Sequence, residues 1–309
     1  MAGVPTVTIP ATSANLGSGF DAFGLALALH NHFTAELADE WSVEITGEGE
    51  GWLSGGPDNR VARSMARVFA EVGQPGLVAR IRCENRIPSG AGLGSSAAAI
   101  VGGLILGDAL CGARLDREML FALATELEGH PDNAAAALYG GFTISWGWSD
   151  EGHPRCVHLE PAGGLAAVVV SAEIPLATDA SRGLLPASVP HADAAFSAGR
   201  AGLLAVGIAV GDSDALAAGL ADRIHEPYRV AAVSDLEAVR TALVAGGAVG
   251  AVLSGAGPTV IGLVHGVDDR DALARAEAVA QRVRGTIATI PGRHEPRALG
   301  IARTGAVLI

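Results

Sequence analysis

A glycine-rich loop that runs directly into an apolar helix is the feature of this sequence best suited to bind an anion. The string PSGAGLGSSAA, residues 88–98, has glycines at positions 90, 92 and 94 and follows a segment that alternates as a strand. Glycines let the backbone approach a phosphate closely, and the N–H groups and dipole of a helix N-terminus favour negative charge. Ser95 and Ser96 can cap that helix, and either hydroxyl can donate a hydrogen bond to the anion. We therefore expect this loop to bind phosphate.

Two other interpretations of the loop remain open. A dinucleotide-binding fingerprint requires a strongly apolar strand immediately before the glycines, whereas the string ENRIP stands here, so this interpretation ranks lower. A loop that is rich in glycine only for tight packing is the structural alternative. A Walker-type P-loop is excluded, because all 21 basic residues are arginine and its lysine is missing.

A second cluster, in the string TELEGHPDN, gathers acids just before a predicted helix. Glu126, Glu128 and Asp132 would repel one another without a cation. Mg²⁺ takes one or two protein carboxylates and completes its octahedron with water and nucleotide phosphates, so either Glu126 or Glu128 could be its ligand. The alternatives are a solvated helix end for Glu128 and a first-turn acid for Asp132. His130 lacks the two close partners that a zinc site requires.

Two further clusters carry groups suited to a small polar ligand. Near the N-terminus, PATSANLGSGFD places Asn15 and Asp21 around flexible glycines, so an amide and a carboxylate can converge on an ammonium group. Either residue alone more often satisfies local backbone in an Asx-turn. In the second half, Arg182 and Arg229 could clamp a carboxylate or a phosphoryl group, although a surface ion pair is commoner for one arginine. A second glycine loop, SGAGPT, occupies 254–259.

The periodicity of apolar residues predicts mixed helices and strands in two domains. Strands are predicted at 6–9, 41–46, 77–84, 165–170, 250–253, 259–264 and 286–290. Helices are predicted at 59–72, 95–110, 115–128, 131–139, 192–210, 214–224, 235–244 and 269–283. Proline and glycines in the loop 160–164 interrupt all periodicity, which gives domains of residues 1–162 and 163–309. The second half favours helices on one face of a mainly antiparallel sheet.

Composition excludes several classes of function. The 309 residues carry a net charge of −12 and their arginines are scattered, so nucleic acid is not an expected partner. The most apolar stretch, 97–110, contains Asp108 and is too short to cross a bilayer, so we expect a buried helix and no membrane association. No secretory signal is expected, and three cysteines without a close pair favour a reducing cytoplasm.

Four of these motifs, in this order, resemble those of the superfamily of galactokinase, homoserine kinase, mevalonate kinase and phosphomevalonate kinase. They are PATSANLGSGFD, IPSGAGLGSSAA, EGHPDNAAAALYGG and SGAGPT, and the resemblance covers nearly the whole chain. Within the superfamily, they are most similar to the motifs of homoserine kinases. The sequence departs from the family at Ser18, where proline is frequent, and before the phosphate loop, where Arg86 stands in place of a frequent lysine.

The resemblance implies a fold and a reaction. It implies an α+β fold with an N-terminal nucleotide-binding domain like domain 2 of ribosomal protein S5 and a C-terminal ferredoxin-like domain. The active site would lie between them. A cytoplasmic homodimer would use ATP with Mg²⁺ to phosphorylate the side-chain hydroxyl of L-homoserine, giving O-phospho-L-homoserine, a step of threonine biosynthesis.

Matching of the motifs also implies roles for individual residues. The substrate would be bound by Asn15, Asp21, His130, Arg182, Arg229 and Gly257. ATP would be bound by Asn59, Pro88, Ser89, Gly90, Ala91, Gly92, Leu93, Gly94, Ser95, Ser96, Ala97 and Ala98. Glu126 and Ser95 would bind Mg²⁺. The reacting centre would contain Asn133, Asp132, Arg182 and Thr178, among which Asp132 is the only acid suited to act as a base.

Two other functions remain open. The same kinase fold could act on another small alcohol such as mevalonate, although Asp21 is placed for an ammonium group. A non-catalytic ligand sensor on this fold is the second alternative, against which Glu126 and the glycine loop argue.

Overall fold

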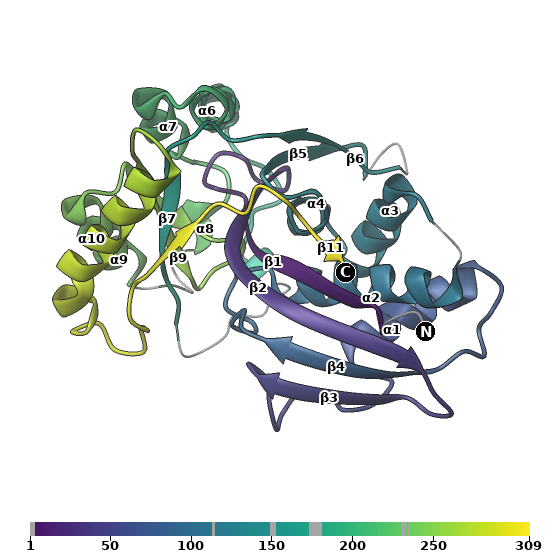
Figure 1. The fold of residues 1–309 in the computed structure, drawn as a ribbon. Coiled ribbons are helices and arrows are strands. Elements are labelled where there is room, and N and C mark those ends of the chain that lie inside the picture. Colours follow the sequence, from purple (N-terminus) through teal and green to yellow (C-terminus); the bar gives the residue numbers. More distant parts are fainter. Residues whose placement is uncertain (1–3, 113–114, 149–152, 173–180, 230–232, 234) are drawn as a thin grey trace.

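The computed structural model contains two β-sheets, with helices packed against each of them (Figure 1). It describes residues 4–112, 115–148, 153–172, 181–229, 233 and 235–309. Within these ranges the first sheet has seven strands in the order β11-β1-β2-β4-β3, with β5 paired to β2 and β6 paired to β5. The second sheet has four strands in the order β10-β7-β9-β8.

The first sheet is built around a long hairpin. Its strands are β1 (Thr6–Ala14), β2 (Phe23–Leu37), β3 (Ser42–Gly47), β4 (Ala79–Asn85), β5 (Phe142–Trp146), β6 (Arg155–Leu159) and β11 (Val307–Leu308). Strands β3 and β4 pair in parallel, and the other pairs are antiparallel. The turn between β1 and β2 carries Asn15 and Asp21, so the hairpin holds this motif at one end of the sheet.

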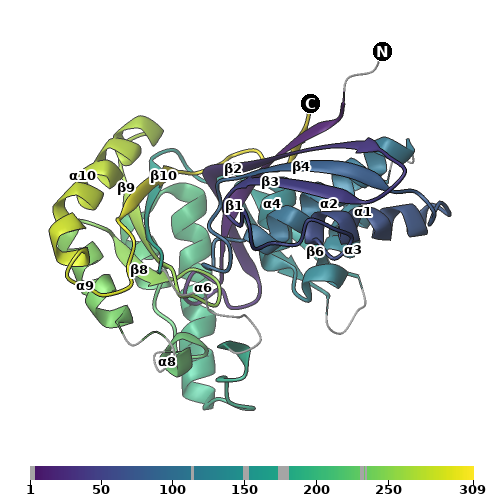
Figure 2. The same ribbon diagram turned by 90° about the horizontal axis from the view of Figure 1, so that it is seen from below.

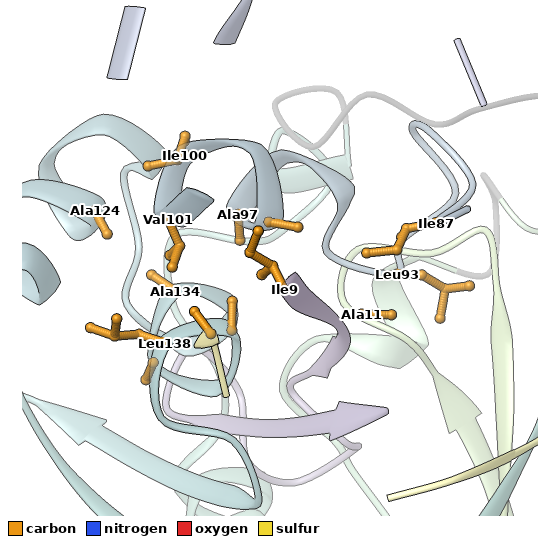
Figure 3. Packing of buried hydrophobic residues seen from close by; sticks show 14 of the residues in the cluster. Ile9, Ala11, Ile87, Leu93, Ala97, Ile100, Val101, Ala124, Ala134 and Leu138 are labelled. Atoms are coloured by element: carbon orange, nitrogen blue, oxygen red, sulfur yellow. The ribbon is translucent and has the colours of Figure 1, made fainter. Parts of the chain in front are cut away.

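Four helices lie along one face of this sheet (Figure 2). They are α1 (Arg60–Glu71), α2 (Ser95–Cys111), α3 (Arg117–Glu128) and α4 (Asp132–Tyr139). Helix α2 carries apolar residues on all sides, and it packs against α1, α3, α4 and β1. The prediction of a buried helix at this position is confirmed. Figure 3 shows Ile9 of β1 in the same packed cluster as Ala97 and Val101 of α2. This packing fixes the position of the α2 N-terminus, where the glycine-rich loop enters.

The second sheet has two covered faces. Its strands are β7 (Leu165–Val170), β8 (Gly250–Leu253), β9 (Val260–His265) and β10 (Arg297–Gly300), all antiparallel. Alternate residues of β7 point to opposite sides. Val168 packs in the core beneath α9 (Leu236–Gly246) and α10 (Asp269–Ile287), whereas Val169 belongs to the core shared with the first sheet. In the described part of this half there are also the helices α6 (His191–Val210), α7 (Ser213–Gly219) and α8 (Glu226–Arg229).

The end of the chain returns to the first sheet. After β10, Ile301 bridges to Leu27 of β2, and β11 then pairs with β1. The first sheet therefore contains strands from both ends of the sequence. The boundary at residue 162 stays a prediction, and residues 307–308 lie in the sheet of the first domain.

Several elements differ from the sequence predictions, each for a physical reason. Strand β2 was missed because the run from Phe23 to Leu29 does not alternate, as its first residues are buried on both faces. The strand predicted at 286–290 is wrong, because Ile287 continues the apolar face of α10 one turn after Val283. The helix predicted at 214–224 ends at Gly219, whose Cα lies against Leu204 of α6.

Short elements were also missed. These are α8, β5, β6, β10 and β11. Helix α8 and strand β11, with four and two residues, are shorter than the window over which an apolar period can be recognised, and β5, β6 and β10, with five, five and four residues, lie at the lower limit of that window.

Helix α6 is long and apolar enough, by length and composition, to cross a membrane. It is the one such helix among the described residues. In the structure it packs along α7 and contributes Leu204 and Ile208 to the core, and 22% of its apolar window is buried. One helix of this kind is weak evidence for a membrane span.

Candidate active site

A pocket lies where the glycine-rich loop, the β1–β2 turn and the second glycine loop meet. All four sequence clusters contribute to its lining, which consists of Asn15, Asp21, Gly90, Gly92, Gly94, Ser95, Ser96, Glu128, His130, Asp132, Asn133, Arg182, Arg229, Gly255, Ala256 and Gly257. A larger cavity of about 820 Å³ opens beside it and shares Gly90, Ser95, Ser96 and Glu128 with it. The predicted phosphate loop thus lies between a small polar pocket and a larger cavity.

Three glycines shape the phosphate loop, because each adopts a positive φ that other residues rarely take. The φ angle is 70° at Gly90, 84° at Gly92 and 69° at Gly94. A Cβ on Gly92 would lie 2.6 Å from the carbonyl oxygen of Ser254, and one on Gly94 would lie 1.8 Å from Oγ1 of Thr12. Gly92 and Gly94 therefore have a packing role, in addition to any role in letting an anion reach the backbone.

The serines after the glycines lie in the first turn of α2 and do not cap it. The N-cap is Gly94, which has no side chain to accept a capping hydrogen bond, so the capping prediction was wrong. The first N–H groups of α2 have no partner within the helix and carry its positive dipole end. The Ser96 hydroxyl donates to Glu128, at 2.5 Å, and accepts from Arg60 Nη1 at 2.9 Å.

One carbonyl oxygen joins three of the sequence motifs. Gly255 O, in the second glycine loop, accepts hydrogen bonds from Asn15 Nδ2 at 2.8 Å and from Arg229 Nη1 at 3.2 Å. The Oδ1 atom of Asn15 accepts from the backbone N–H of Asp21 at 2.9 Å. Both ends of the Asn15 amide therefore hold backbone in place, which is the local role that the sequence left open, while the residue still lines the pocket.

Asp21 and Arg182 form a fork-to-fork ion pair at the edge of the pocket. Arg182 donates from Nη1 to Asp21 Oδ2 at 2.9 Å and from Nη2 to Oδ1 at 2.7 Å. Such bidentate pairs are both stronger and more directional than single contacts. The structure therefore brings together two residues that are 161 positions apart in the sequence, and it places opposite charges side by side in the pocket.

Arg229 is fully buried and is held by a neutral histidine. Arg229 Nη1 donates to His225 Nδ1 at 3.0 Å. The imidazole ring of His225 stacks on the ring of Phe20, with the two centroids 5.0 Å apart. Because His225 Nδ1 accepts this bond, its Nε2 must carry the proton that it donates to Gly17 O at 2.7 Å. Burial lowers the pKa of His225 to about 4, and burial also lowers that of Arg229. The guanidinium of Arg229 is thus anchored to the β1–β2 turn.

His130, Asp132 and Asn133 form a connected group at the start of α4. Asp132 Oδ1 accepts from His130 Nδ1 at 2.6 Å and from the Asn133 N–H at 2.7 Å. Burial alone would lower the pKa of His130, but the hydrogen bond and the charges of Asp132 and Glu128 raise it above the usual value. Thr12 donates to Asn133 Oδ1 at 2.7 Å, which ties this group to β1.

The two candidate metal ligands of α3 lie on opposite sides of the helix. Glu126 has a side chain that is 57% exposed, and it forms an ion pair with Arg67 outside the pocket. Glu128 is only 9% exposed, lines the pocket and contacts Ser96. Burial raises the pKa of Glu128, although the Ser96 hydroxyl opposes this shift. The structure brings Glu128, and not Glu126, to the phosphate loop.

Comparison with known proteins agrees with this geometry. Residues 59–141 match the model of the GHMP kinases N terminal domain, and residues 204–285 match that of the GHMP kinases C terminal domain. The chain belongs to the GHMP kinase family. Its two-domain fold is the one predicted from the sequence.

Relatives within the family are similar over nearly the whole chain. A homoserine kinase of Moorella thermoacetica is 40% identical over 90% of this chain and 94% of its own length. A homoserine kinase of Streptomyces coelicolor is 44% identical over 89% and 87% of the two chains. The crystal structure of a homoserine kinase from Cytophaga hutchinsonii superimposes with a TM-score of 0.86 at 26% identity, covering 100% of this chain and 98% of the other.

Other nucleotide-loop residues of this GHMP kinase lie in different surroundings. Leu93, Ala97 and Ala98 are buried in the core, so only their backbone could face a ligand. Ala91 is also buried, and its carbonyl accepts from the Thr259 N–H at 3.2 Å. Ser89 lines the larger cavity, and Pro88 and Ser89 line a smaller one next to it. Thr178 lies outside the described residues.

Asn59 has a structural role in addition to its place in the larger cavity. Its Oδ1 accepts from the Val61 N–H, which makes it the N-cap of α1, and its Nδ2 donates to Ser54 O at 2.8 Å. The Asn59 side chain, which was predicted to bind the nucleotide, therefore already fixes the turn before α1.

Sequence reasoning undervalued two residues of this site. Glu128 lies four residues after buried Ala124 and seven after buried Phe121, so the helical period already placed it on the buried face. Arg60 was not predicted, because a single arginine at a helix start belongs to none of the motifs, yet its guanidinium contacts Ser96 and lines the larger cavity.

Proposed function

We propose that this GHMP kinase transfers the γ-phosphoryl group of ATP to the side-chain hydroxyl of L-homoserine. The observation that carries the proposal is the pocket in which a helix N-terminus with a glycine loop faces Asp21, Arg182 and Arg229. The helix N-terminus and its glycine loop can bind phosphate. Asp21, Arg182 and Arg229 offer one carboxylate and two guanidinium groups to a zwitterionic acceptor. The similarity to homoserine kinases over about nine-tenths of the chain supports the same acceptor.

The acceptor would be bound through its charged ends. Its ammonium group would share the Asp21 carboxylate with Arg182, and its carboxylate would pair with buried Arg229. The Asn133 amide nitrogen would add a donor, and so would His130 in its charged form, which the hydrogen bond and charge of Asp132 favour by raising the pKa of the ring. With both ends fixed, the side-chain hydroxyl is directed toward the phosphate loop, which is the positioning that phosphoryl transfer chiefly needs.

The triphosphate would be held by backbone and by arginine, since the chain has no lysine. The first N–H groups of α2 and the exposed Gly90 supply the cradle. Arg60, at the mouth of the larger cavity, supplies a cation next to Ser96. Charge that builds on the transferred group would be stabilised by Arg182.

We propose Glu128 with Ser95 as the protein ligands of Mg²⁺. The donor set fits, because a buried carboxylate and a hydroxyl are two of the six oxygen ligands that Mg²⁺ needs when nucleotide and water supply the rest. Among the described residues no group of three His, Cys, Asp or Glu side chains could bind a metal alone. Bound Mg²⁺ would neutralise phosphate charge.

Asp132 is the proposed proton acceptor, with a limited part in the reaction. Its Oδ1 is already engaged by His130 and by the Asn133 N–H. A loose phosphoryl-transfer transition state develops little need for a base, so positioning would contribute more than proton transfer. We further propose that the enzyme works as a cytoplasmic homodimer, which light scattering of the purified protein would test.

The proposal is tested by ADP release from purified protein with ATP, Mg²⁺ and a panel of L-homoserine, L-serine, L-threonine, mevalonate and galactose. Turnover with L-homoserine far above the others is the expected result. Preferred turnover of mevalonate would keep the phosphate site and overturn the acceptor. Absence of turnover with every alcohol would favour a ligand sensor.

A further inference from the structure

The two arginines of the pocket are held by different kinds of partner. Arg182 forms two hydrogen bonds with the Asp21 carboxylate, which pairs its charge within the protein. Arg229 donates instead from Nη1 to His225 Nδ1 at 3.0 Å and to Gly255 O at 3.2 Å. Asp21 attracts Arg229 through space. In the described part of the chain, the hydrogen bonds of Arg229 therefore go to uncharged groups and not to a carboxylate.

His225 is fully buried, and its ring is fixed by its neighbours. Its Nε2 donates to Gly17 O at 2.7 Å, and the ring stacks on Phe20 with an interplanar angle of 18°. The backbone N–H of His225 donates to Asp222 Oδ2 at 2.9 Å, which fixes the turn that leads into α8. The guanidinium carbon of Arg229 lies 5.5 Å from the centroid of the same Phe20 ring. The imidazole therefore offers no surface to a ligand, but it determines where the guanidinium lies.

A neutral imidazole orients an arginine without cancelling its charge. Burial keeps the His225 ring uncharged near neutral pH, because it lowers the pKa of the ring to about 4. A guanidinium has five N–H donors, so one bond to Nδ1 directs the group and leaves other donors for a ligand. A buried arginine that bonds to no carboxylate costs free energy, which a carboxylate entering the pocket that Arg229 lines would offset.

We propose that His225 is the positioning residue that makes this site select phosphoryl acceptors with a carboxylate, because its Nδ1 directs the Arg229 guanidinium at the pocket without neutralising it. The inference rests on the proposed function, in which Arg229 pairs with the carboxylate of the phosphoryl acceptor. Without Nδ1, Gly255 O is the remaining hydrogen-bond partner of Arg229 among the described residues. Binding of the carboxylate would then also have to order the guanidinium, which weakens binding.

The test separates the two nitrogen atoms of the His225 ring. Asparagine can place its Oδ1 where Nδ1 lies and so keep the bond to Arg229, whereas glutamine can place its Nε2 where the ring Nε2 lies and keep the bond to Gly17. His225→Ala removes both bonds. The matched control is His265→Ala, because His265 also bonds to a neighbour, Ser213, and does not line the pocket.

Steady-state kinetics would compare L-homoserine with 3-aminopropan-1-ol, which has the same hydroxyl and ammonium groups but no carboxylate. His225→Ala and His225→Gln should raise KM for L-homoserine about 10- to 100-fold, the usual effect of losing one hydrogen bond to a charged group. His225→Asn and His265→Ala should stay within about threefold of wild type. In every variant, KM for ATP and the affinity for 3-aminopropan-1-ol, as substrate or competitive inhibitor, should change less than about threefold, since neither involves a carboxylate on Arg229.

The possible outcomes separate the inference from the proposed function. Equal losses for the two phosphoryl acceptors, or an equal loss for ATP, would show that His225 has only a structural role. An unchanged KM for L-homoserine in His225→Ala, or a greater loss in His225→Asn than in His225→Gln, would overturn the inference and leave the kinase intact. The asparagine and glutamine variants decide even if His225→Ala does not fold. Absence of turnover of L-homoserine by wild type would instead overturn the proposed function, and the inference with it.

Discussion

At the scale of single residues, the site is made of side chains that are already engaged with one another. Asp21 pairs with Arg182, Asn15 bonds to two backbone groups, and Asp132 accepts from His130. A ligand-binding site usually leaves such groups open to the ligand, but here the protein supplies partners of opposite charge. Residue identity alone therefore does not show which atoms remain available, and the two glutamates of α3 illustrate this best.

Replacement of Glu128 by alanine should lower kcat with saturating ATP by at least about 100-fold, the usual effect of removing one charge-stabilising group. The physical reason is that Glu128 lines the pocket beside Ser96. Glu126→Ala is the matched control, two residues away, and removes only the exposed pair with Arg67, worth at most about 1 kcal/mol. Steady-state kinetics at several Mg²⁺ concentrations would measure both. An inactive Glu126→Ala variant together with an active Glu128→Ala variant would show that Glu126, and not Glu128, is the Mg²⁺ ligand.

Neutral His225 should make stability fall in acid. Its pKa is lowered from 6.5 to about 4 in the folded protein, so the unfolded chain binds the extra proton first as pH falls. Stability should decrease between about pH 6.5 and 4, by up to about 3 kcal/mol from this group. Urea unfolding of wild type and His225→Gln at pH 4.5 and 7 would measure it.

The pH dependence should be weaker in His225→Gln, because glutamine takes up no proton. His191→Gln, at an exposed position at the start of α6, should show the pH dependence of wild type. An identical slope in wild type and His225→Gln would show that His225 is not the neutral, buried ring described here.

At the scale of elements, the glycine loop and α2 act as one unit. Both ends of α2 are glycines with positive φ, Gly94 before it and Gly112 after it. Their surroundings differ, because a Cβ on Gly94 would overlap the Thr12 hydroxyl, whereas one on Gly112 would meet nothing within 4 Å.

This difference gives a paired prediction. Gly94→Ala and Gly112→Ala should each lose about 1 kcal/mol of unfolding free energy from backbone strain. Gly94→Ala should lose about 1–3 kcal/mol more from overpacking and should also raise KM for ATP, because the loop must shift. Thermal unfolding and ATP kinetics would measure the two effects. Equal losses in the two variants would contradict the close packing of the loop on β1.

The sequence predicted elements with a helical apolar period or with an uninterrupted apolar run. Val61, Met65 and Val68 predicted α1, and the run at 165–170 predicted β7, which is buried on both faces. The sequence failed for β2, whose apolar residues follow directly on a glycine-rich turn, and where pairing partners are distant, as in β11. For the site, glycines and charged residues identified the loops, but only the fold shows that Gly255 O joins Asn15 to Arg229.

At the scale of the whole molecule, the two halves share one core. Val169 and Leu263 of the second sheet pack in the same cluster as Ile9 and Phe33 of the first. The loops are also tied, since Ser254 Oγ donates to Gly92 O at 2.6 Å. A site between two domains that share a core should depend on both for its geometry.

We therefore expect a single cooperative unfolding transition. All four tryptophans lie at positions 41 to 148, so their fluorescence reports on the first half, whereas far-ultraviolet circular dichroism reports on both. The two thermal transitions should coincide within about 2 °C, as two-state unfolding requires. A second transition in circular dichroism alone would show that the halves unfold independently.

We propose that Asp21, Arg182 and Arg229 make this pocket specific for an amino acid whose hydroxyl faces the phosphate loop. Its most direct test is the kcat/KM for L-homoserine against that for 4-hydroxybutanoate, which has the same hydroxyl and carboxylate but lacks the ammonium group. L-homoserine should be favoured on the order of 100-fold or more, because the analogue lacks the ammonium group that would share the Asp21 carboxylate with Arg182. Equal values for the two acceptors would contradict it.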